Sequence, residues 1–219
     1  MSERLRVVGI SGPVGAGKSS IASLLAKDAA FAATIGGAVV LVDADETLRV
    51  ARRTQRPLRE AIIALHPASR LPDGSLDTQR LAAAAFADPT LLARLEGLQW
   101  PIVVEAIAMA RSSAQQGGAA LLLVEAIALV KSGLAAGCDL ILNLHASREV
   151  RAARFVARGG SREDFDRRDA AQEGLAAALR AAGAIEIDAS GSPELSVAAA
   201  AEAIRRVCFS GDDHLRTRR

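Results

Sequence analysis

One short segment near the amino terminus constrains the fold of this chain more than any other. Residues 12–19 read Gly-Pro-Val-Gly-Ala-Gly-Lys-Ser, which fits the pattern G-x-x-x-x-G-K-[ST]. An apolar run at residues 5–10 precedes the segment, and the helical pattern of residues 20–25 follows it. This order predicts a buried strand, a glycine-rich turn and a helix, with backbone N–H groups and the positive end of the helix converging on one point.

Such a turn is typical of a phosphate-binding loop. Lys18 would reach the β- and γ-phosphates of a nucleotide, and the Ser19 hydroxyl would bind Mg²⁺. The chain contains 27 lysines and arginines, of which only residues 18, 27 and 131 are lysines, so a lysine at this position is informative. The nucleotide-binding residues expected here are Gly12, Pro13, Val14, Gly15, Ala16, Gly17, Lys18, Ser19 and Ser20.

Strand-like and helical segments alternate along much of the chain. Apolar runs at 39–42, 120–124, 140–144 and 184–187 read as further buried strands. The pattern predicts an α/β fold in three layers, with a doubly wound, parallel, five-stranded sheet covered by helices. The alternation stops between residues 48 and 116. We expect a nucleotide-binding core at 1–48 and 117–209, a helical insertion at 49–116 near the carboxyl ends of the strands, and a flexible tail at 210–219.

The composition of the chain limits the kinds of partner that it is expected to bind. The net charge of +2 and the lack of aromatic residues among the basic ones argue against nucleic acid. The longest apolar stretch, residues 119–130, is short and contains Glu125, so no membrane segment is expected. No signal peptide precedes the first strand, which favours a cytoplasmic protein. We expect a monomer or a weak homo-oligomer that binds a small-molecule acceptor.

Two acidic residues at the end of the second predicted strand favour a kinase over other nucleotide hydrolases. A kinase needs a carboxylate near the acceptor hydroxyl, and Asp43 and Asp45 follow the strand directly. Residues two apart in a strand share one face, so one carboxylate could address Mg²⁺-bound water and the other the acceptor. A helix-capping role for either aspartate stays open. The Asn-Lys-x-Asp segment typical of GTPases is absent from the sequence.

A group of arginines near residue 150 predicts a lid over the nucleotide. Arg151, Arg154 and Arg158 recur at helical spacing, and Gly159-Gly160 would supply a hinge. Arginines in a lid can neutralise charge on the phosphoryl group during transfer. A solvent-exposed helix face is the alternative, above all for Arg148 and Arg151.

These motifs together resemble one family, the dephospho-coenzyme A kinases. The phosphate loop and Asp43-Ala44-Asp45-x-x-x-Arg49 resemble the opening of that family. The resemblance covers about residues 5–207. Its most specific part is Gly-Ser-Leu-Asp-Thr-Gln-Arg-Leu at 74–81, continued by Phe-Ala-Asp-Pro at 86–89 and Leu92-x-x-Leu95-Glu96. Arg154-x-x-x-Arg158 and Arg168-x-x-x-Gln172 resemble the lid of that family, and residues 187–192 resemble its last strand and the following turn.

The resemblance implies a reaction and a set of residues. Members of the family transfer the γ-phosphoryl group of ATP, with Mg²⁺, to the ribose 3′-hydroxyl of dephospho-coenzyme A, using the phosphate-loop kinase fold. Asp45 then matches the catalytic base, and Arg154 and Arg158 match a lid at about 148–172. The implied catalytic set is Asp45, Lys18 and Arg154. The resemblance also places Arg49 on the acceptor side. From their own positions we add Asp43, Trp100 and Glu125 to the acceptor set of Asp45 and Arg49, with Asp43 or Glu125 joining Ser19 at Mg²⁺ through water. A helix-capping or structural role for Glu125 stays open.

The sequence departs from the family mainly on the acceptor side. Trp100 stands where His is usual before a proline, Leu121 replaces a proline, and Gly183 replaces an aspartate. The segment between Lys18 and Asp43 is also longer than usual. Trp100 could stack on the base of an acceptor or fill a core. Two alternatives therefore stay open: a diverged kinase for another nucleoside or sugar-like molecule, and a nucleotide-binding regulator without transfer chemistry.

Overall fold

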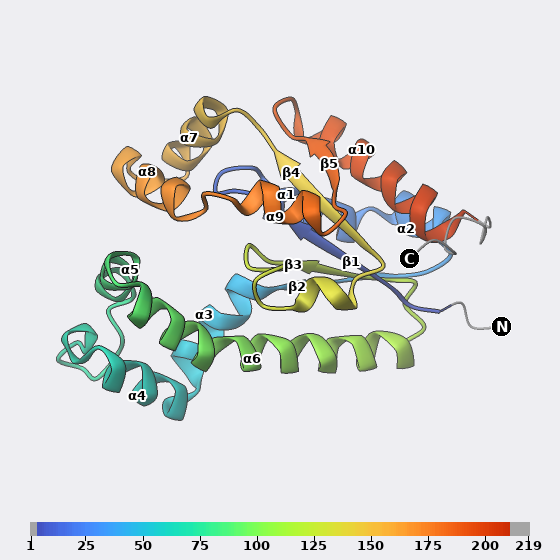
Figure 1. The fold of residues 1–219 in the computed structure, drawn as a ribbon. Coiled ribbons are helices and arrows are strands. Elements are labelled where there is room, and N and C mark those ends of the chain that lie inside the picture. Colours follow the sequence, from blue (N-terminus) through green and yellow to red (C-terminus); the bar gives the residue numbers. More distant parts are fainter. Residues whose placement is uncertain (1–3, 211–219) are drawn as a thin grey trace. The chain divides into compact units, whose positions relative to one another are not determined.

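The computed structural model describes residues 4–210 and contains one five-stranded sheet in the order β2-β3-β1-β4-β5 (Figure 1). The strands are β1 (Arg6–Ser11), β2 (Val39–Asp43), β3 (Leu121–Glu125), β4 (Leu140–His145) and β5 (Ile185–Asp188). The pairings of β1 with β3, β1 with β4 and β4 with β5 are parallel. The expected α/β fold with a parallel sheet flanked by helices is confirmed.

The central strands are apolar because both faces of the sheet are covered. β1 pairs with β3 on one side and β4 on the other, so the chain order reverses beside β1. At such a switch point the loops after neighbouring strands diverge and leave room for a ligand. The glycine-rich segment follows β1 directly and therefore lies at this point.

Helices α1 (Lys18–Lys27) and α10 (Pro193–Ile204) pack on one face of the sheet. Buried Leu25 and Ile204 join Ile10 and Leu142 in a single apolar core. On the other face, α9 (Leu175–Ala181) lies against β4, and Leu129 closely approaches Gly9. The sheet thus forms the middle of three layers.

The remaining helices and turns of this core lie in the connections between strands and after α10. A small helix, α2 (Ala29–Thr34), occupies the long segment before β2, and Asp28 caps its N-terminus. Two helices follow β4, namely α7 (Arg148–Ala157) and α8 (Arg162–Ala171). A 3₁₀ turn spans Leu134–Gly137, and a π turn, Arg205–Phe209, extends α10. Ser192 occupies the N-cap position of α10, and its side chain makes no capping hydrogen bond.

The chain divides into two compact units. One unit runs to Val42 and resumes at Ala110, and the other is Asp43–Met109. The second unit contains α3 (Ala44–Thr54), α4 (Arg56–Leu65), a 3₁₀ turn (Pro67–Ser69), α5 (Thr78–Ala87) and most of α6 (Pro89–Gln116). It has its own apolar core, which includes Leu58, Ile62, Leu81 and Leu95.

Local sequence signals account for the helix boundaries in this second unit. The Asp77 carboxylate accepts a hydrogen bond from the Arg80 N–H and caps α5. The Asp88 carboxylate accepts from Thr90 N–H at 2.8 Å and starts α6 in the same way. Within residues 4–210, no helix is both long and apolar enough to cross a membrane. Of the expected tail at 210–219, residues 211–219 lie outside the described part.

Candidate active site

The phosphate loop connects β1 to α1 and has the backbone that its glycines predict. Gly17 has φ 97° at the N-cap position, and α1 begins at Lys18. Gly12 has φ 144°, and a Cβ there would lie 2.2 Å from the Leu144 carbonyl oxygen. Only glycine fits so close to β4, so this contact fixes how the loop leaves the sheet.

The side chains that would hold Mg²⁺ and phosphate lie at the start of α1. The Ser19 hydroxyl donates to Glu125 Oε1 at 3.1 Å, and Glu125 is only 3% exposed at the end of β3. Lys18 Nζ donates to the Pro13 carbonyl at 3.3 Å and is also buried. Hydroxyl and carboxylate oxygens are the donors that Mg²⁺ prefers, so the pair Ser19 and Glu125 fits this ion.

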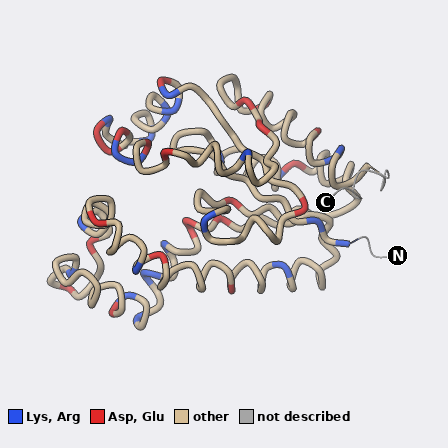
Figure 2. Tube along the Cα trace, in the orientation of Figure 1, with Lys and Arg blue, Asp and Glu red and all other residues tan. Residues whose placement is uncertain are grey.

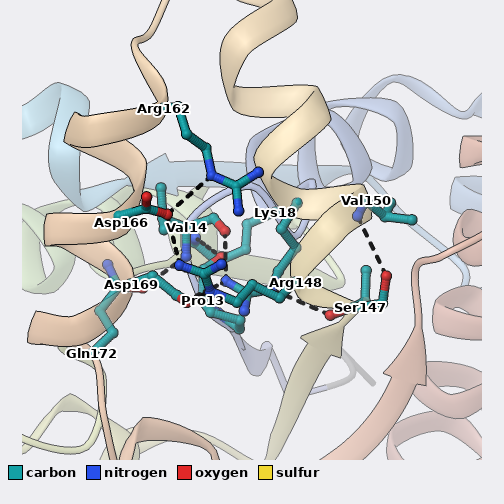
Figure 3. Close-up of polar contacts among 12 residues, drawn as sticks. Pro13, Val14, Lys18, Ser147, Arg148, Val150, Arg162, Asp166, Asp169 and Gln172 are labelled. Carbon is teal, nitrogen blue, oxygen red and sulfur yellow. Dashed lines mark hydrogen bonds and ion pairs between the residues drawn. The ribbon is translucent and has the colours of Figure 1, made fainter.

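The two helices after β4, α7 and α8, are joined to the phosphate loop by hydrogen bonds to the backbone of one loop residue, Val14. Gln172 caps the C-terminus of α8, and its Oε1 accepts a hydrogen bond from Val14 N–H at 2.7 Å. Arg151 Nη1 donates to the Val14 carbonyl oxygen at 3.1 Å. Figure 3 shows Gln172 and Asp169 pointing toward Pro13 and Val14. Both polar groups of Val14 are therefore bound by the α7–α8 segment.

Arg151 carries this connection into α8. Its Nη1 also donates to Asp169 Oδ1 at 2.6 Å, and its Nε donates to the Ala146 carbonyl. Asp169 accepts a second charged hydrogen bond from Arg148 Nε at 3.0 Å. Burial opposes ionisation of Asp169, but the bonds and charges of Arg151 and Arg148 prevail and lower its pKa. We call Val14, Arg151, Asp169 and Gln172 the lid latch.

Apolar contacts stabilise the same pair of helices. Phe165 is fully buried on α8 and packs against Phe155 of α7, with ring centroids 6.0 Å apart. The guanidinium groups of Arg148 and Arg151 lie 5.5 and 5.6 Å from the centre of the Phe165 ring. A Cβ on Gly160 would meet the Phe155 ring at 2.1 Å, so a larger residue there would require that ring to move.

The two lid arginines expected to contact ATP have different environments. Arg154 Nη1 donates to the Ala189 carbonyl at 2.7 Å, and Nη2 donates to the Gly191 carbonyl at 3.0 Å. These bonds tie α7 to the loop after β5. Arg158 is exposed beyond the end of α7, and its Nε donates to the Arg154 carbonyl. The alternative of a solvent-exposed helix face does not hold for Arg151, because its side chain is buried in the lid latch.

The predicted acceptor residues lie at the start of the Asp43–Met109 unit. Asp43 ends β2 and caps α3, since its carboxylate accepts from Glu46 N–H at 2.9 Å. Asp45 is exposed in the first turn of α3. The expectation that the two aspartates share a strand face is wrong, because α3 begins at Ala44 and residues two apart on a helix point in different directions.

The remaining acceptor candidates are distributed over both units. Arg49 is exposed on α3 and forms an ion pair with Glu46. Trp100 is half-buried on α6 within the Asp43–Met109 unit. Glu125 belongs to the other unit, where its oxygen faces the Ser19 hydroxyl.

Comparison with known proteins assigns this arrangement to a family. The family model described as "Dephospho-CoA kinase" matches residues 6–193, which is most of the chain. The chain belongs to the dephospho-CoA kinase family. Members of this family are kinases that transfer a phosphate group to a hydroxyl.

Two individual dephospho-CoA kinases are similar to this chain over most of their length. The Corynebacterium glutamicum enzyme is 33% identical over 189 residues, which cover 85% of this chain and 92% of that protein. The Geobacter sulfurreducens enzyme is 27% identical over 192 residues, or 87% and 92% of the two chains.

Solved structures agree with the fold. A crystal structure from Thermus thermophilus has a TM-score of 0.76 at 26% identity, covering 95% of this chain and 100% of that one. The Campylobacter jejuni dephospho-CoA kinase has a TM-score of 0.57 at 14% identity, covering 91% and 97%, and supports the fold alone.

The lid latch was missed as a functional unit from the sequence of this family member. In the sequence Gln172 appears only as part of a lid motif, and Asp169 belongs to no motif. The sequence contains a partial signal for this contact. Arg148 and Arg151 lie on α7 and Asp169 lies on α8, and a buried cation on one helix needs a carboxylate partner on the next. Nothing in the local pattern indicates that Val14 is the shared partner.

Proposed function

We propose that this chain transfers the γ-phosphoryl group of ATP to the ribose 3′-hydroxyl of dephospho-CoA, giving CoA. Membership of the dephospho-CoA kinase family supports the reaction. The observation that carries the nucleotide side is the phosphate loop with Ser19 beside buried Glu125, in a chain of that family.

In this proposal the first unit binds ATP. The backbone amides of the loop and Lys18 hold the phosphates, and Ser19 with Glu125 holds Mg²⁺, directly or through water. When bound, Mg²⁺ would neutralise charge on the phosphate oxygens. Arg154 and Arg158 lie on the lid segment and would face the nucleotide as it closes.

The Asp43–Met109 unit binds the acceptor in the same proposal. Asp45 is exposed and accepts the proton of the 3′-hydroxyl as the phosphoryl group moves. Asp43 acts on Asp45 indirectly, because its cap fixes the first turn of α3. Arg49 and Trp100 contribute to acceptor binding, the arginine by hydrogen-bond donation from its guanidinium and the indole by stacking.

The direct test is an assay of the purified chain with ATP, Mg²⁺ and dephospho-CoA, with CoA identified by mass spectrometry. We expect ATP-dependent CoA formation that Lys18→Ala abolishes. A panel of other nucleosides and sugars should give at least tenfold lower kcat/KM. Turnover of another alcohol without turnover of dephospho-CoA would contradict the proposed acceptor, and absence of any transfer would contradict the proposed enzyme class.

A further inference from the structure

One face of α3 carries a carboxylate and two guanidinium groups. Asp45, Arg49 and Arg52 have the spacing i, i+4 and i+7, which places them in one row on the helix surface. The rise from Asp45 to Arg52 is about 10 Å along the helix axis. Figure 2 marks the basic residues of this helix in blue and its acidic residues in red. The row therefore offers a base at one end and positive charge further along.

The positive charge of Arg49 is already compensated within α3. Its Nε donates to Glu46 Oε2 at 2.6 Å, and its Nη2 donates to Glu46 Oε1 at 2.5 Å. The hydrogen bond from Arg49 lowers the pKa of Glu46, so the pair is ionised on both sides. Both side chains are exposed, and the pair adds little net charge to the row.

Arg52 has a different partner. It is half-buried, and its Nε and Nη2 both donate to Oε1 of Gln99 on α6, the first at 3.0 Å. Gln99 is 5% exposed, and its Nε2 donates to the Leu95 carbonyl at 3.0 Å, which fixes the direction of the amide. Among residues 4–210, the structure gives Arg52 Nη1 no hydrogen-bond partner.

Gln99 is neutral and does not neutralise Arg52, whose charge is offset only in part by the carboxylate of Asp45. Burial lowers the pKa of the Arg52 guanidinium, and the charge of Asp45 opposes that shift. A carboxylate at position 99 would balance the cation, whereas a carboxamide only orients it. The Gln99 amide thus positions a charged group without neutralising it, at a cost in stability that a bound anion would offset.

We propose that Arg52, oriented by Gln99, binds a phosphate group of the acceptor. The inference rests on the proposed function, because it takes Asp45 as the residue that faces the 3′-hydroxyl. A nucleoside with a 5′-phosphate chain carries its hydroxyl and its anionic group on one ribose, as the row on α3 requires. Arginine suits this role because its planar group donates two parallel hydrogen bonds to phosphate.

The test is steady-state kinetics of Arg52→Met with dephospho-CoA and with adenosine, which has the same hydroxyl but no phosphate. We expect the KM for dephospho-CoA to rise about 10- to 100-fold, with kcat and the KM for ATP changed less than threefold. The kcat/KM for adenosine should not change. Inorganic pyrophosphate should compete with dephospho-CoA in the wild type at saturating ATP and lose most of this effect in Arg52→Met.

Two further variants separate anion binding from other roles of Arg52. Gln99→Glu keeps the guanidinium in place but neutralises it, so the KM for dephospho-CoA should rise as in Arg52→Met. Arg53→Met removes the adjacent exposed arginine and should change that KM less than threefold. An unchanged KM in both Arg52→Met and Gln99→Glu would overturn the proposal. Equal losses with adenosine and dephospho-CoA would instead indicate a purely structural role.

The proposal can fail separately from the proposed function. If the wild type does not phosphorylate dephospho-CoA, the acceptor assignment fails whatever Arg52 does. Calorimetric titration with pyrophosphate, with the phosphate loop filled by a non-hydrolysable ATP analogue, then still tests the anion site. Binding that Arg52→Met and Gln99→Glu both weaken at least tenfold would retain it, and equal binding by all three proteins would refute it.

Discussion

Asp45 illustrates how a single residue acquires a role from its place in a helix. It lies in the first turn of α3, directly after the cap formed by Asp43. The positive end of the helix N-terminus favours negative charge at this position. A carboxylate in a rigid, exposed first turn suits the proposed proton acceptor.

Replacing Asp45 by Asn should lower kcat by roughly 10²–10⁴-fold, since the amide cannot accept the hydroxyl proton. ATP binding, measured by calorimetry, should stay within about twofold of the wild type. Asp43→Asn is the matched control, because it keeps a capping oxygen and should reduce kcat far less. Normal turnover by Asp45→Asn would exclude it as the base.

The thiol of Cys138 provides a pH-dependent prediction at the same scale. Burial, followed by the charge of Asp139, raises the pKa of Cys138 to about 11 from its ordinary value of 9.0. The folded state thus prefers the neutral thiol. The stability that the neutral Cys138 thiol contributes to the folded state is complete below pH 9.0 and is lost as the pH rises from 9.0 to about 11.

Urea unfolding from pH 8 to 11 should therefore show a loss of stability that is smaller in Cys138→Ala. Alkylation of Cys138 in the folded protein should also be about 100-fold slower at pH 8 than in a free thiol, in line with its reduced thiolate fraction. Identical pH slopes for the variant and the wild type would show that this thiol does not titrate as described.

At the scale of elements, the lid latch connects α8 to the phosphate loop through buried polar groups. Arg151 is 8% exposed and joins the Val14 carbonyl to the Asp169 carboxylate. Because a partly buried guanidinium needs a negative partner, removal of Asp169 should affect both elements together. Exposed ion pairs on α8, such as Arg167 with Asp164, lack this connection.

Asp169→Ala should lower the free energy of unfolding by about 2 kcal/mol, less than for a fully buried pair because the carboxylate keeps some contact with solvent. Hydrogen exchange should accelerate in α7, α8 and the phosphate loop, and the KM for ATP should rise. Arg167→Ala is the control and should cost less than about 0.5 kcal/mol. Equal effects of the two substitutions would mean that the latch contributes no more than a surface pair.

At the scale of the whole molecule, the chain has two compact units, each with its own apolar core. The sheet unit is built around strands such as β3, in which Leu123 is fully buried. The Asp43–Met109 unit is built from helices around Ile62, which is also fully buried. Separate cores allow the units to differ in local stability.

Ile62→Ala should destabilise the helical unit by about 2–5 kcal/mol, through lost burial and the cavity that remains. Hydrogen exchange should accelerate mainly within Asp43–Met109, with the strand amides changed little. Leu123→Ala should give the opposite pattern. If both substitutions accelerated exchange uniformly over the whole chain, the two units would unfold as one.

The sequence predicted the regular parts of this molecule well for a physical reason. Strand runs such as 140–144 and the glycines of the phosphate loop are local signals that need no distant partner. The prediction failed where an element changes type within two residues, as at Asp43 and Asp45. The sequence left open whether Arg151 is exposed, because the partner that a charged residue needs when buried lies far away in the chain.

By itself, the sequence determined the α/β order of elements, the phosphate loop and the resemblance to the family, because each depends on residue types at fixed spacing. Only the tertiary structure decided which polar groups meet: Ser19 with Glu125, Val14 with Gln172, and Arg52 with Gln99. These partners lie 47 to 158 residues apart in the chain. Burial of a polar group requires a partner, and the folded chain alone determines which one it finds.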